Sequence, residues 1–564
     1  MDMKGKLARA LAGITGADAA ELCEWMEAPK RRELGDYAFP CFRLARTLKQ
    51  APAAIAEELA RAVALPDGIS RAEAAGGYLN FFVDRQSFAR DVLSRALDER
   101  EQYGRSTEGA GKTVCVEYSS INIAKPMHIG HLSTTVLGNS LKRIYDRLGY
   151  DTVSINHLGD WGTQFGKMIA AYKHWGAPEL LETGGVRDLV ALYIRFHAEA
   201  EAEPSLDDEA RAWFRKIEQH DEEAWALFQR FKEITMKEAD RVYALLGVEF
   251  DSYAGENFYE DKMQPVIDEI RAKGLATVDG GALIVDLSEY DMPPCIILKS
   301  DGGTIYATRD LAAACYRKAT YDFHKLLYVV AYQQNLHFRQ IFKVLELMGH
   351  DWVKDCVHVN FGMVSIEDGS LSTRKGNVVY LDDVLHAAIE KTRAVIEEKS
   401  PDLEDKDEVA RQVGVGAVVW GTLYNSRIKD IVFSYAKALN FDGETGPYAQ
   451  YTYARCCSVL RKASGYDLCA ADMSALEDEF SGALIRAIHE FPEVVREAAE
   501  KYEPYLVARA VIAICAAFNR FYYEHRIMED DPAVRNARLA LTDAAKCAVG
   551  AGLSLLGIET PERM

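Results

Sequence analysis

The sequence predicts an α/β protein: a parallel-sheet domain in the middle, a small α/β domain before it and an all-helical bundle after it. From about residue 106 to 395, strand-like runs alternate with amphipathic helical stretches, which is the pattern of βαβ units. After about residue 395 strand patterns vanish and amphipathic helices continue to Met564. The length of 564 residues exceeds what one core supports, so we expect about three domains.

Composition narrows the class of protein. A hydrophobic content of 49% with 27% charged residues describes a folded globular chain. The longest apolar stretches are too short to span a membrane, and the N-terminus lacks a secretory pattern. We therefore expect a cytoplasmic protein with no membrane partner. The 11 cysteines show no metal-ligand spacing, so we expect free thiols and no bound zinc.

Residues 1–105 form the predicted first domain, in which helices such as "PAAIAEELARAVAL" accompany the β-rich run "GGYLNFFVD". The second domain, 106–395, opens with "KTVCVEYSS", a helix from "IGHLSTTVLG" onward, and "DTVSINHLGDWG". A polar, aromatic-bearing helical insertion is expected at about 172–246, after which "KLLYVVAY" and "CVHVNFGMV" resume the strand pattern. In such sheets the ligand crevice lies beyond the carboxyl ends of the strands.

A cluster of basic side chains lies between the first strand and helix of this domain. Lys125 precedes His128, Gly130 and His131. Gly130 has no Cβ, so a flat ring could pack against the start of the helix, where unpaired N–H groups favour phosphate. Together, the histidines and Lys125 could hold a nucleotide triphosphate and stabilise charge that develops at the α-phosphorus. The alternative is a pair of structural histidines.

A glycine-punctuated loop follows a later strand, within "GMVSIEDGSLSTRKGNVVYL". Ser372, Arg374 and Lys375 of this loop could contact phosphate oxygens at the same crevice. The alternative is an ordinary solvated turn. Near the first crevice residues, Trp161 in "HLGDWGTQFG" could either shape the ATP site or pack inside a turn.

A phenol and a carboxylate are spaced to share one helix face. Tyr306 and Asp310 are four residues apart in "TIYATRDLAAACYRK", so a helix would bring them together. A carboxylate binds the planar, always charged guanidinium group through two parallel hydrogen bonds. The alternative places Asp310 at a helix N-terminus or beside Arg309.

The predicted helical domain, 396–564, carries rings interleaved with positive charge. In "GPYAQYTYARCCSVLRKA", Tyr448 and Arg455 exemplify a pattern that suits unstacked RNA bases over a phosphate track. The overall net charge of −20 argues against a nucleic-acid partner, but only the local field at the contact matters. A local excess of basic residues begins at Arg427 and Lys429. The alternatives are tyrosines that pack inward and a solvated basic face.

These motifs together resemble the class I aminoacyl-tRNA synthetases, and specifically the arginyl-tRNA synthetase family. The resemblance extends over the whole chain and rests on "SSINIAKPMHIGHL", "NHLGDWGTQFGK", "YATRDLAAA", "QQNLHFRQIF", "LSTRKGNVV", "GPYAQYTYAR" and "LLGIETPERM". It implies a class I Rossmann-type catalytic domain, an N-terminal domain that contacts tRNA and a helical anticodon-binding domain. The substrates implied are L-arginine, ATP with Mg²⁺ and tRNA(Arg), and the implied state is a monomer.

The resemblance also implies residue roles. Tyr306 and Asp310 match guanidinium contacts. Further arginine contacts are implied at Glu117, Asn122, Gln334 and Glu256, and His128 is expected beside the substrate carboxylate. Tyr522 and Met564 match anticodon contacts, and Asn80 matches a tRNA contact of the first domain.

Three positions depart from the family pattern. Ile121 replaces a proline, and Ser133 stands where an arginine often follows the histidine motif. Ser370 leaves no lysine at the head of the later loop, a loss for which Lys125 is thought to compensate. Two rival functions stay open: a synthetase or nucleotidyltransferase for another substrate, and a non-catalytic RNA-binding relative. The sequence does not indicate isoacceptor preference, rate constants or organism.

Overall fold

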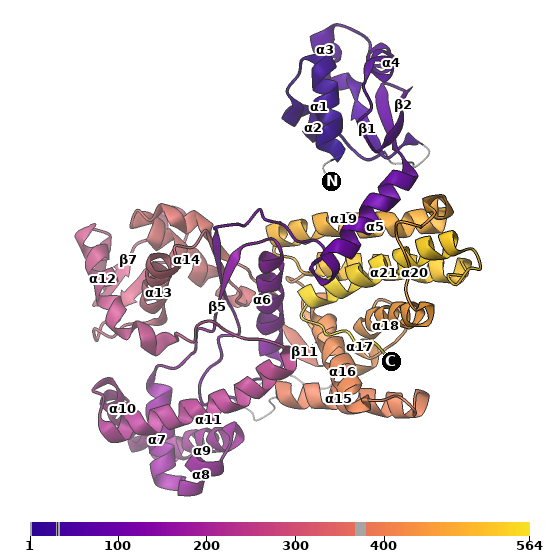
Figure 1. Ribbon diagram of the computed structural model, residues 1–564. Coiled ribbons are helices and arrows are strands. Elements are labelled where there is room, and N and C mark those ends of the chain that lie inside the picture. The colour runs from indigo at the N-terminus through magenta and orange to yellow at the C-terminus, as the bar shows by residue number, and fades with distance from the viewer. Residues whose placement is uncertain (1–2, 30, 32–33, 367–378) are drawn as a thin grey trace. The chain divides into compact units, whose positions relative to one another are not determined.

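The computed structural model describes residues 3–29, 31, 34–366 and 379–564 (Figure 1). Contacts within the chain divide it into two compact units. The first comprises Met1–Asp98, Leu460–His489 and Ala517–Ala545, and the second comprises Glu99–Val459, Glu490–Ala516 and Lys546–Met564. Each unit is described by itself.

The first unit contains an antiparallel three-stranded sheet in the order β1-β3-β2. Its N-terminal elements are α1 (Met3–Thr15), α2 (Ala19–Trp25), β1 (Tyr37–Pro40), α3 (Ala45–Leu48), α4 (Pro52–Ala62), β2 (Ile69–Ala75), β3 (Tyr78–Val83) and α5 (Arg85–Glu99). Helix α1 packs Leu7 and Leu11 against Phe39 and Phe81 of the sheet, and all four side chains are fully buried. Burial of these apolar groups is the main force that holds this part together.

The second unit is built on a parallel sheet in the order β10-β9-β4-β5. Its strands are β4 (Thr113–Glu117), β5 (Asp151–Ile155), β9 (Lys325–Tyr328) and β10 (Cys356–His358). The central strand β4 pairs Val114 with Lys325 on one side and Thr152 on the other. Its residues from Val114 to Glu117 are buried, as expected for a strand covered on both faces.

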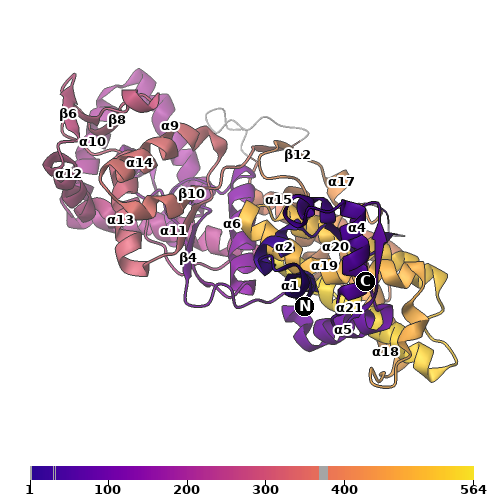
Figure 2. The same ribbon diagram turned by 90° about the horizontal axis from the view of Figure 1, so that it is seen from above.

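Helix α6 (Gly130–Arg147) follows β4 and packs against β4 and β5 on one side and α16 (Lys406–Leu423) on the other (Figures 1 and 2). A glycine permits the close approach: a Cβ at Gly138 would lie 2.2 Å from Cγ of Tyr118. On its other side, the Ser140 hydroxyl donates to the Leu555 carbonyl at 2.8 Å. The middle of α6 is therefore held close to Tyr118, the residue that follows β4.

A helical insertion follows β5. It contains α7 (Thr163–Trp175), α8 (Pro178–Thr183), α9 (Val186–Ala202), α10 (Ser205–Glu218) and α11 (Glu222–Leu246). Trp161, at its entrance, is 7% exposed, and its ring packs 5.3 Å from Phe214 and 6.4 Å from Phe228. The structure thus supports the interpretation of Trp161 as part of a packed turn.

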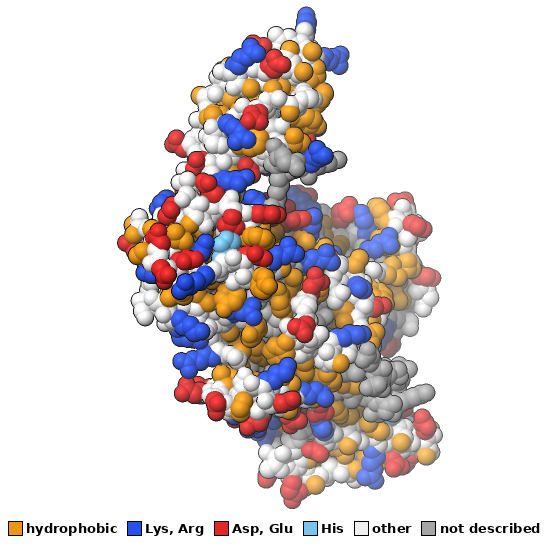
Figure 3. Space-filling view, turned by 90° about the vertical axis from the view of Figure 1, so that its right-hand side faces the viewer, with side chains coloured by type: hydrophobic (Ala, Val, Ile, Leu, Met, Phe, Trp, Pro, Cys, Tyr) orange, Lys and Arg blue, Asp and Glu red, His pale blue; other side chains and the backbone are white. Residues whose placement is uncertain are grey.

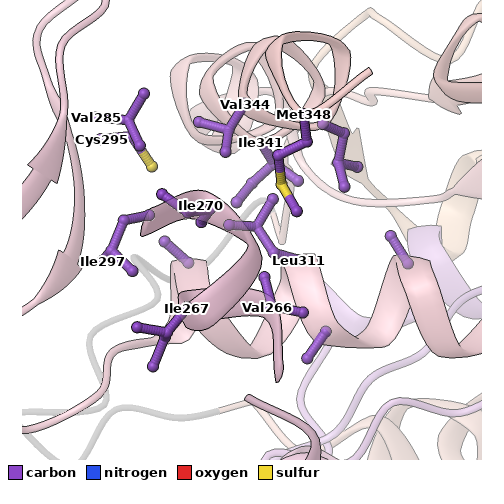
Figure 4. Packing of buried hydrophobic residues seen from close by; sticks show 14 of the residues in the cluster. Val266, Ile267, Ile270, Val285, Cys295, Ile297, Leu311, Ile341, Val344 and Met348 are labelled. Carbon is purple, nitrogen blue, oxygen red and sulfur yellow. The ribbon is translucent and has the colours of Figure 1, made fainter. Parts of the chain in front are cut away.

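A second apolar core supports the helix that carries Tyr306 and Asp310 (Figure 4). It lies among α12 (Met263–Ala272), α13 (Tyr306–Tyr321), α14 (Asn335–Leu347) and the antiparallel strands β6 (Ala276–Asp279), β7 (Ala282–Val285) and β8 (Cys295–Leu298). Leu311 of α13 and Val344 of α14 are fully buried there, opposite Ile270 of α12. This packing fixes the position of α13.

The C-terminal part contains α15 (Leu381–Lys399), α16, α17 (Tyr435–Ala438), α18 (Gly446–Ala463), α19 (Glu479–Lys501), α20 (Tyr505–Glu524) and α21 (Pro532–Leu555). The prediction of an all-helical segment from residue 396 is wrong at one place, where β12 (Ile431–Phe433) pairs in parallel with β11 (Val364–Ile366). A three-residue strand leaves too short a pattern to detect. Within the described chain, only α20 is long and apolar enough to cross a bilayer, and its residues Val507, Val511 and Ile514 are fully buried, as in a core helix.

Candidate active site

The strands of the parallel sheet present chemically active residues at their carboxyl ends. Glu117 ends β4, Asn156 follows β5, Tyr328 ends β9 and His358 ends β10. This edge is where parallel α/β sheets bind ligands. Of the predicted site residues that the structure describes, Glu117 lies at this edge, and Asn122, Lys125, His128 and His131 follow it in the segment that leads into α6.

The turn between β4 and α6 has an unusual backbone. Ser119, Ser120 and Ala124 all have positive φ angles, of 67°, 48° and 60°, which residues with a Cβ adopt at a cost of roughly 1–3 kcal/mol each. Side chains from two helices hold this conformation. The amide of Ser119 donates to Thr134 Oγ1 at 3.0 Å, and the amide of Ala124 donates to Thr235 Oγ1 at 3.0 Å. The turn therefore delivers the following residues to a defined position.

Those residues include the predicted imidazole pair. Nδ1 of His128 accepts the Gly130 amide at 3.1 Å, and Nδ1 of His131 accepts the His128 amide at 3.1 Å. An added Cβ on Gly130 would lie 2.8 Å from the His128 ring, so a larger residue here would displace that ring from its observed position. Burial lowers the pKa of His131 to about 3 and also lowers the pKa of His128. Both rings are therefore neutral, and since Nδ1 accepts, each carries its proton on Nε2.

Lys125 is coupled electrostatically to His128 and to Glu256, and Glu256 lies 4.0 Å from Arg309 of α13. Burial lowers the pKa of Lys125, which Glu256 opposes, and Lys125 in turn lowers the pKa of His128. Burial raises the pKa of Glu256 to about 7, with Asp310 and Asp160 adding to the rise and Arg309 opposing it. These mutual influences couple the charge states of the imidazole pair, Lys125 and the acidic residues, and their membership of one site stays a prediction.

The predicted phosphate-contacting residues Ser372, Arg374 and Lys375 lie outside the described residues, as does Ser370. The chain that follows them is joined directly to the histidine segment. The Ile129 amide donates to the Val379 carbonyl at 3.1 Å, and the Leu381 amide donates to the Met127 carbonyl at 3.0 Å. Residues 379–381 therefore lie at the imidazole pair.

Tyr306 and Asp310 lie in the first turns of α13. Asp310 Oδ2 accepts a hydrogen bond from His337 Nε2 at 2.6 Å, and the Tyr306 ring lies 5.2 Å from the His337 ring. Burial raises the pKa of Asp310, but His337 and nearby positive groups outweigh this effect, so the net pKa is lowered. Asp310 is thus an anion, while the Tyr306 side chain is exposed. The partner of Asp310 is His337, in place of the Arg309 pairing considered above.

Glu117 forms an ion pair with Arg317 of α13, and both side chains are buried. The Arg317 guanidinium lies 5.9 Å from the ring centre of Tyr259 and 5.6 Å from that of Tyr328. One side of the Glu117 carboxylate is therefore already occupied by a cation of the protein itself. Its predicted contact with a ligand stays a prediction and would use the remaining lone pairs.

Two further predicted contacts lie outside the strands and α-helices, Asn122 at an isolated bridge and Gln334 at the end of the 3-10 helix Tyr332–Gln334. Asn122 pairs through its backbone with Gly159, where a Cβ would lie 2.5 Å from Asn122 Oδ1. Gln334 is exposed and directly precedes α14. Sequence reasoning missed Arg317, His157 and His337, which surround Asp310 and Glu117. His157 and His337 lie within the quoted segments "NHLGDWG" and "QQNLHF", but no sequence spacing connects them.

Comparison with known proteins shows the family of the chain. Residues 92–435 match the family described as "tRNA synthetases class I (R), catalytic domain", 449–564 match "DALR anticodon binding domain", and 1–83 match "Arginyl tRNA synthetase N terminal domain". The chain is 51% identical to the arginine–tRNA ligase of Alkaliphilus metalliredigens, covering 100% of both chains. It is 54% identical to that of Clostridioides difficile, covering 96% of this chain and 95% of the relative.

The chain belongs to the arginyl-tRNA synthetase family. Its fold agrees with the solved arginyl-tRNA synthetase of Thermus thermophilus, with a TM-score of 0.82, 25% identity and 100% coverage of both chains. Fold and family assignments made from the motifs are therefore confirmed. The individual residue roles stay predictions.

In this arginyl-tRNA synthetase family member, the predicted tRNA contacts occupy varied environments. Tyr448 and Arg455 lie half-buried on α18, and Tyr522 of α20 is 42% exposed. Met564 packs partly against a small apolar cluster. Asn80 is 4% exposed in β3, so a tRNA would have to reach a covered side chain. Figure 3 shows Lys and Arg interspersed with Asp and Glu on one face.

The basic patch that begins at Arg427 is only partly a solvated face. Arg427 is half-buried and donates to Asn360, and its Nε lies 3.7 Å from Glu503 Oε1. The neighbouring Lys429 is exposed. Ser133, the second departure from the family pattern, is buried and lines a small cavity of about 20 Å³ together with Arg427 and Glu503.

Proposed function

We propose that this protein is an arginine–tRNA ligase. In the first step, the carboxylate of L-arginine attacks the α-phosphorus of ATP, which forms arginyl-adenylate and releases pyrophosphate. In the second step, the 2′-hydroxyl of the 3′-terminal adenosine of tRNA(Arg) attacks the acyl carbon, AMP leaves, and the hydroxyl proton is released. One observation supports the proposal most: Asp310, an anion beside Tyr306, is coupled through the charges of Glu256 and Lys125 to two neutral imidazoles.

The neutral imidazoles suit the first step. In each ring Nδ1 accepts a backbone amide, so the N–H group at Nε2 can donate to a ligand. Neither ring is positively charged near neutral pH. We propose that His128 and His131 hold ATP oxygens and stabilise the charge that develops at the α-phosphorus, with Lys125 adding a fixed positive charge. Arg374, Lys375 and Ser372 are proposed to complete the phosphate contacts, and Mg²⁺ enters with ATP as part of the substrate.

The acidic side of the site suits arginine. Asp310 offers carboxylate oxygens to a guanidinium, and Tyr306 adds a phenol on the same helix face. Glu256, Glu117, Asn122 and Gln334 are proposed to complete the contacts with the amino acid. Catalysis then rests on positioning and charge stabilisation, without a covalent intermediate between enzyme and substrate.

For tRNA, we propose that the helical domain binds the anticodon region through Tyr448, Arg455, Tyr522 and Met564, and that the N-terminal domain, including Asn80, contacts the tRNA elsewhere. Half-exposed rings beside positive charge support this role. We further propose that the enzyme works as a monomer in the cytoplasm.

The direct test is pyrophosphate exchange and tRNA charging with arginine, lysine or glutamate, each with and without tRNA(Arg). Among the three amino acids, we expect only arginine to support activity. We also expect pyrophosphate exchange with arginine to require tRNA(Arg). Asp310→Asn keeps the shape of the side chain and removes its charge, so it should cost about 2–5 kcal/mol in kcat/KM for arginine while the KM for ATP stays near its original value. Comparable exchange with lysine, or a fully active variant, would contradict the proposal.

A further inference from the structure

Glu117 and Asp310 are both proposed to contact arginine, and they lie on different elements. Two intervening side chains, Arg317 and His157, connect them. Glu117 pairs with Arg317, whose side chain is 1% exposed. Arg317 Nη2 lies 3.3 Å from His157 Nδ1, and His157 Nε2 lies 4.0 Å from Asp310 Oδ1. The link therefore runs from the end of β4 through α13 to the loop after β5 and back to α13.

Arg317 determines the tautomer of His157. A guanidinium group only donates hydrogen bonds, so His157 Nδ1 must be the acceptor. The proton of the neutral ring is then on Nε2, which faces Asp310. A second proton on Nδ1 would break the bond to Arg317 and place two cations side by side. The ring is also held by Tyr259, with which it stacks at 5.6 Å and 26°.

His337 holds the other oxygen of the same carboxylate. Its Nε2 lies 2.6 Å from Asp310 Oδ2, and because a carboxylate only accepts, His337 is the donor. The ring lies 5.2 Å from that of Tyr306 and 5.3 Å from that of Phe338. Asp310 thus has one imidazole facing each of its oxygens, and each oxygen keeps a lone pair for a ligand.

We propose that His337 and His157 are positioning residues for arginine recognition: they hold the plane of the Asp310 carboxylate so that both oxygens face the forked guanidinium group. A guanidinium gains two parallel hydrogen bonds only if the carboxylate lies in its plane, whereas a compact ammonium has no such requirement. The two imidazoles therefore favour arginine over lysine. This inference rests on the proposed function.

The test is a matched pair of variants at one position. His337→Phe keeps a ring beside Tyr306 and Phe338 but removes the N–H donor, and His337→Gln keeps a donor without the ring. In tRNA charging, His337→Phe should raise the arginine KM about tenfold or more, as expected for a lost charge-assisted hydrogen bond. The KM for ATP should stay within about twofold, and His337→Gln should restore most of the arginine affinity. An unchanged arginine KM in His337→Phe, or equal losses in both variants, would overturn the proposal.

Controls separate folding from positioning. His386, exposed on α15, provides the matched substitution His386→Phe, which should leave both KM values unchanged. If thermal unfolding shows that His337→Phe does not fold, the positioning role is tested instead by comparing His157→Phe with His157→Gln. Here Phe keeps the stack on Tyr259, and Gln keeps an N–H toward Asp310. A parent protein that does not charge tRNA with arginine refutes the proposed function, whereas an active parent with unaffected variants at the tested position refutes only the positioning roles.

Discussion

We predict that the raised pKa of Glu256, a proposed arginine contact, makes arginine binding depend on pH. Burial raises this pKa to about 7, so the side chain changes from mostly neutral to mostly charged between pH 6 and pH 8. A cationic substrate binds the charged form better, and by linkage its affinity rises with pH. His131, with a pKa of about 3, and Asp310, with a lowered pKa, do not change charge over this range.

The magnitude follows from the pKa. If arginine binds only when Glu256 is charged, the apparent KM is multiplied by one plus the ratio of the protonated to the charged form. This factor is about 1.1 at pH 8 and about 11 at pH 6 for a pKa near 7. We therefore expect the arginine KM to rise about tenfold as the pH falls from 8 to 6.

The assay is the arginine KM in tRNA charging at half-unit pH steps, with a constant-ionic-strength buffer and saturating ATP. Glu256→Gln keeps the shape of the side chain but removes its ionisable carboxyl group. The arginine KM of this variant should therefore be high and independent of pH. Arg309 lies 4.0 Å from Glu256 and lowers its pKa, so Arg309→Met should move the midpoint to higher pH. The same pH slope in Glu256→Gln as in the parent, or a flat parent profile, would refute the reasoning.

Three further predictions concern helix α6 and the turn that precedes it. Gly138→Ala should destabilise the fold by about 1–3 kcal/mol, because its Cβ would lie 2.2 Å from a tyrosine ring atom. Gly421→Ala, with ordinary contacts at 3.7 Å, is the matched control in denaturant unfolding and should be neutral or stabilising. His131→Ala should lower kcat with little change in the arginine KM, and a pure KM effect would contradict its role. Thr235→Val leaves the buried Ala124 amide without its acceptor and should cost about 1–3 kcal/mol of stability, seen as a lower melting temperature. An unchanged melting temperature would argue against this contact.

Local features were predictable because they depend on neighbours in the chain. The strand before His128, the helix that begins at Gly130 and the helical spacing of Tyr306 and Asp310 all follow from periodicity and short motifs. The family also followed from motifs, since each of them reports a local backbone shape and a set of side chains. The strand Ile431–Phe433 could not be predicted from local pattern, because it forms only through its pairing with β11.

Partners of buried charges were not predictable in this way. Arg317, His157 and His337 come from different helices and loops, and nothing in their spacing shows that they meet at Glu117 and Asp310. Buried charges must find partners wherever the fold brings polar groups together.

The amino-acid sequence alone determined the class of fold and the family, and it predicts the residues that bind a triphosphate and a guanidinium. Only the tertiary structure decided that the two histidines of the motif are neutral, that Glu256 has a pKa near 7 and that Glu117 already holds an arginine of the chain. The physical reason is that charge states and hydrogen-bond partners depend on burial and on groups distant in sequence, which only the folded chain brings within reach.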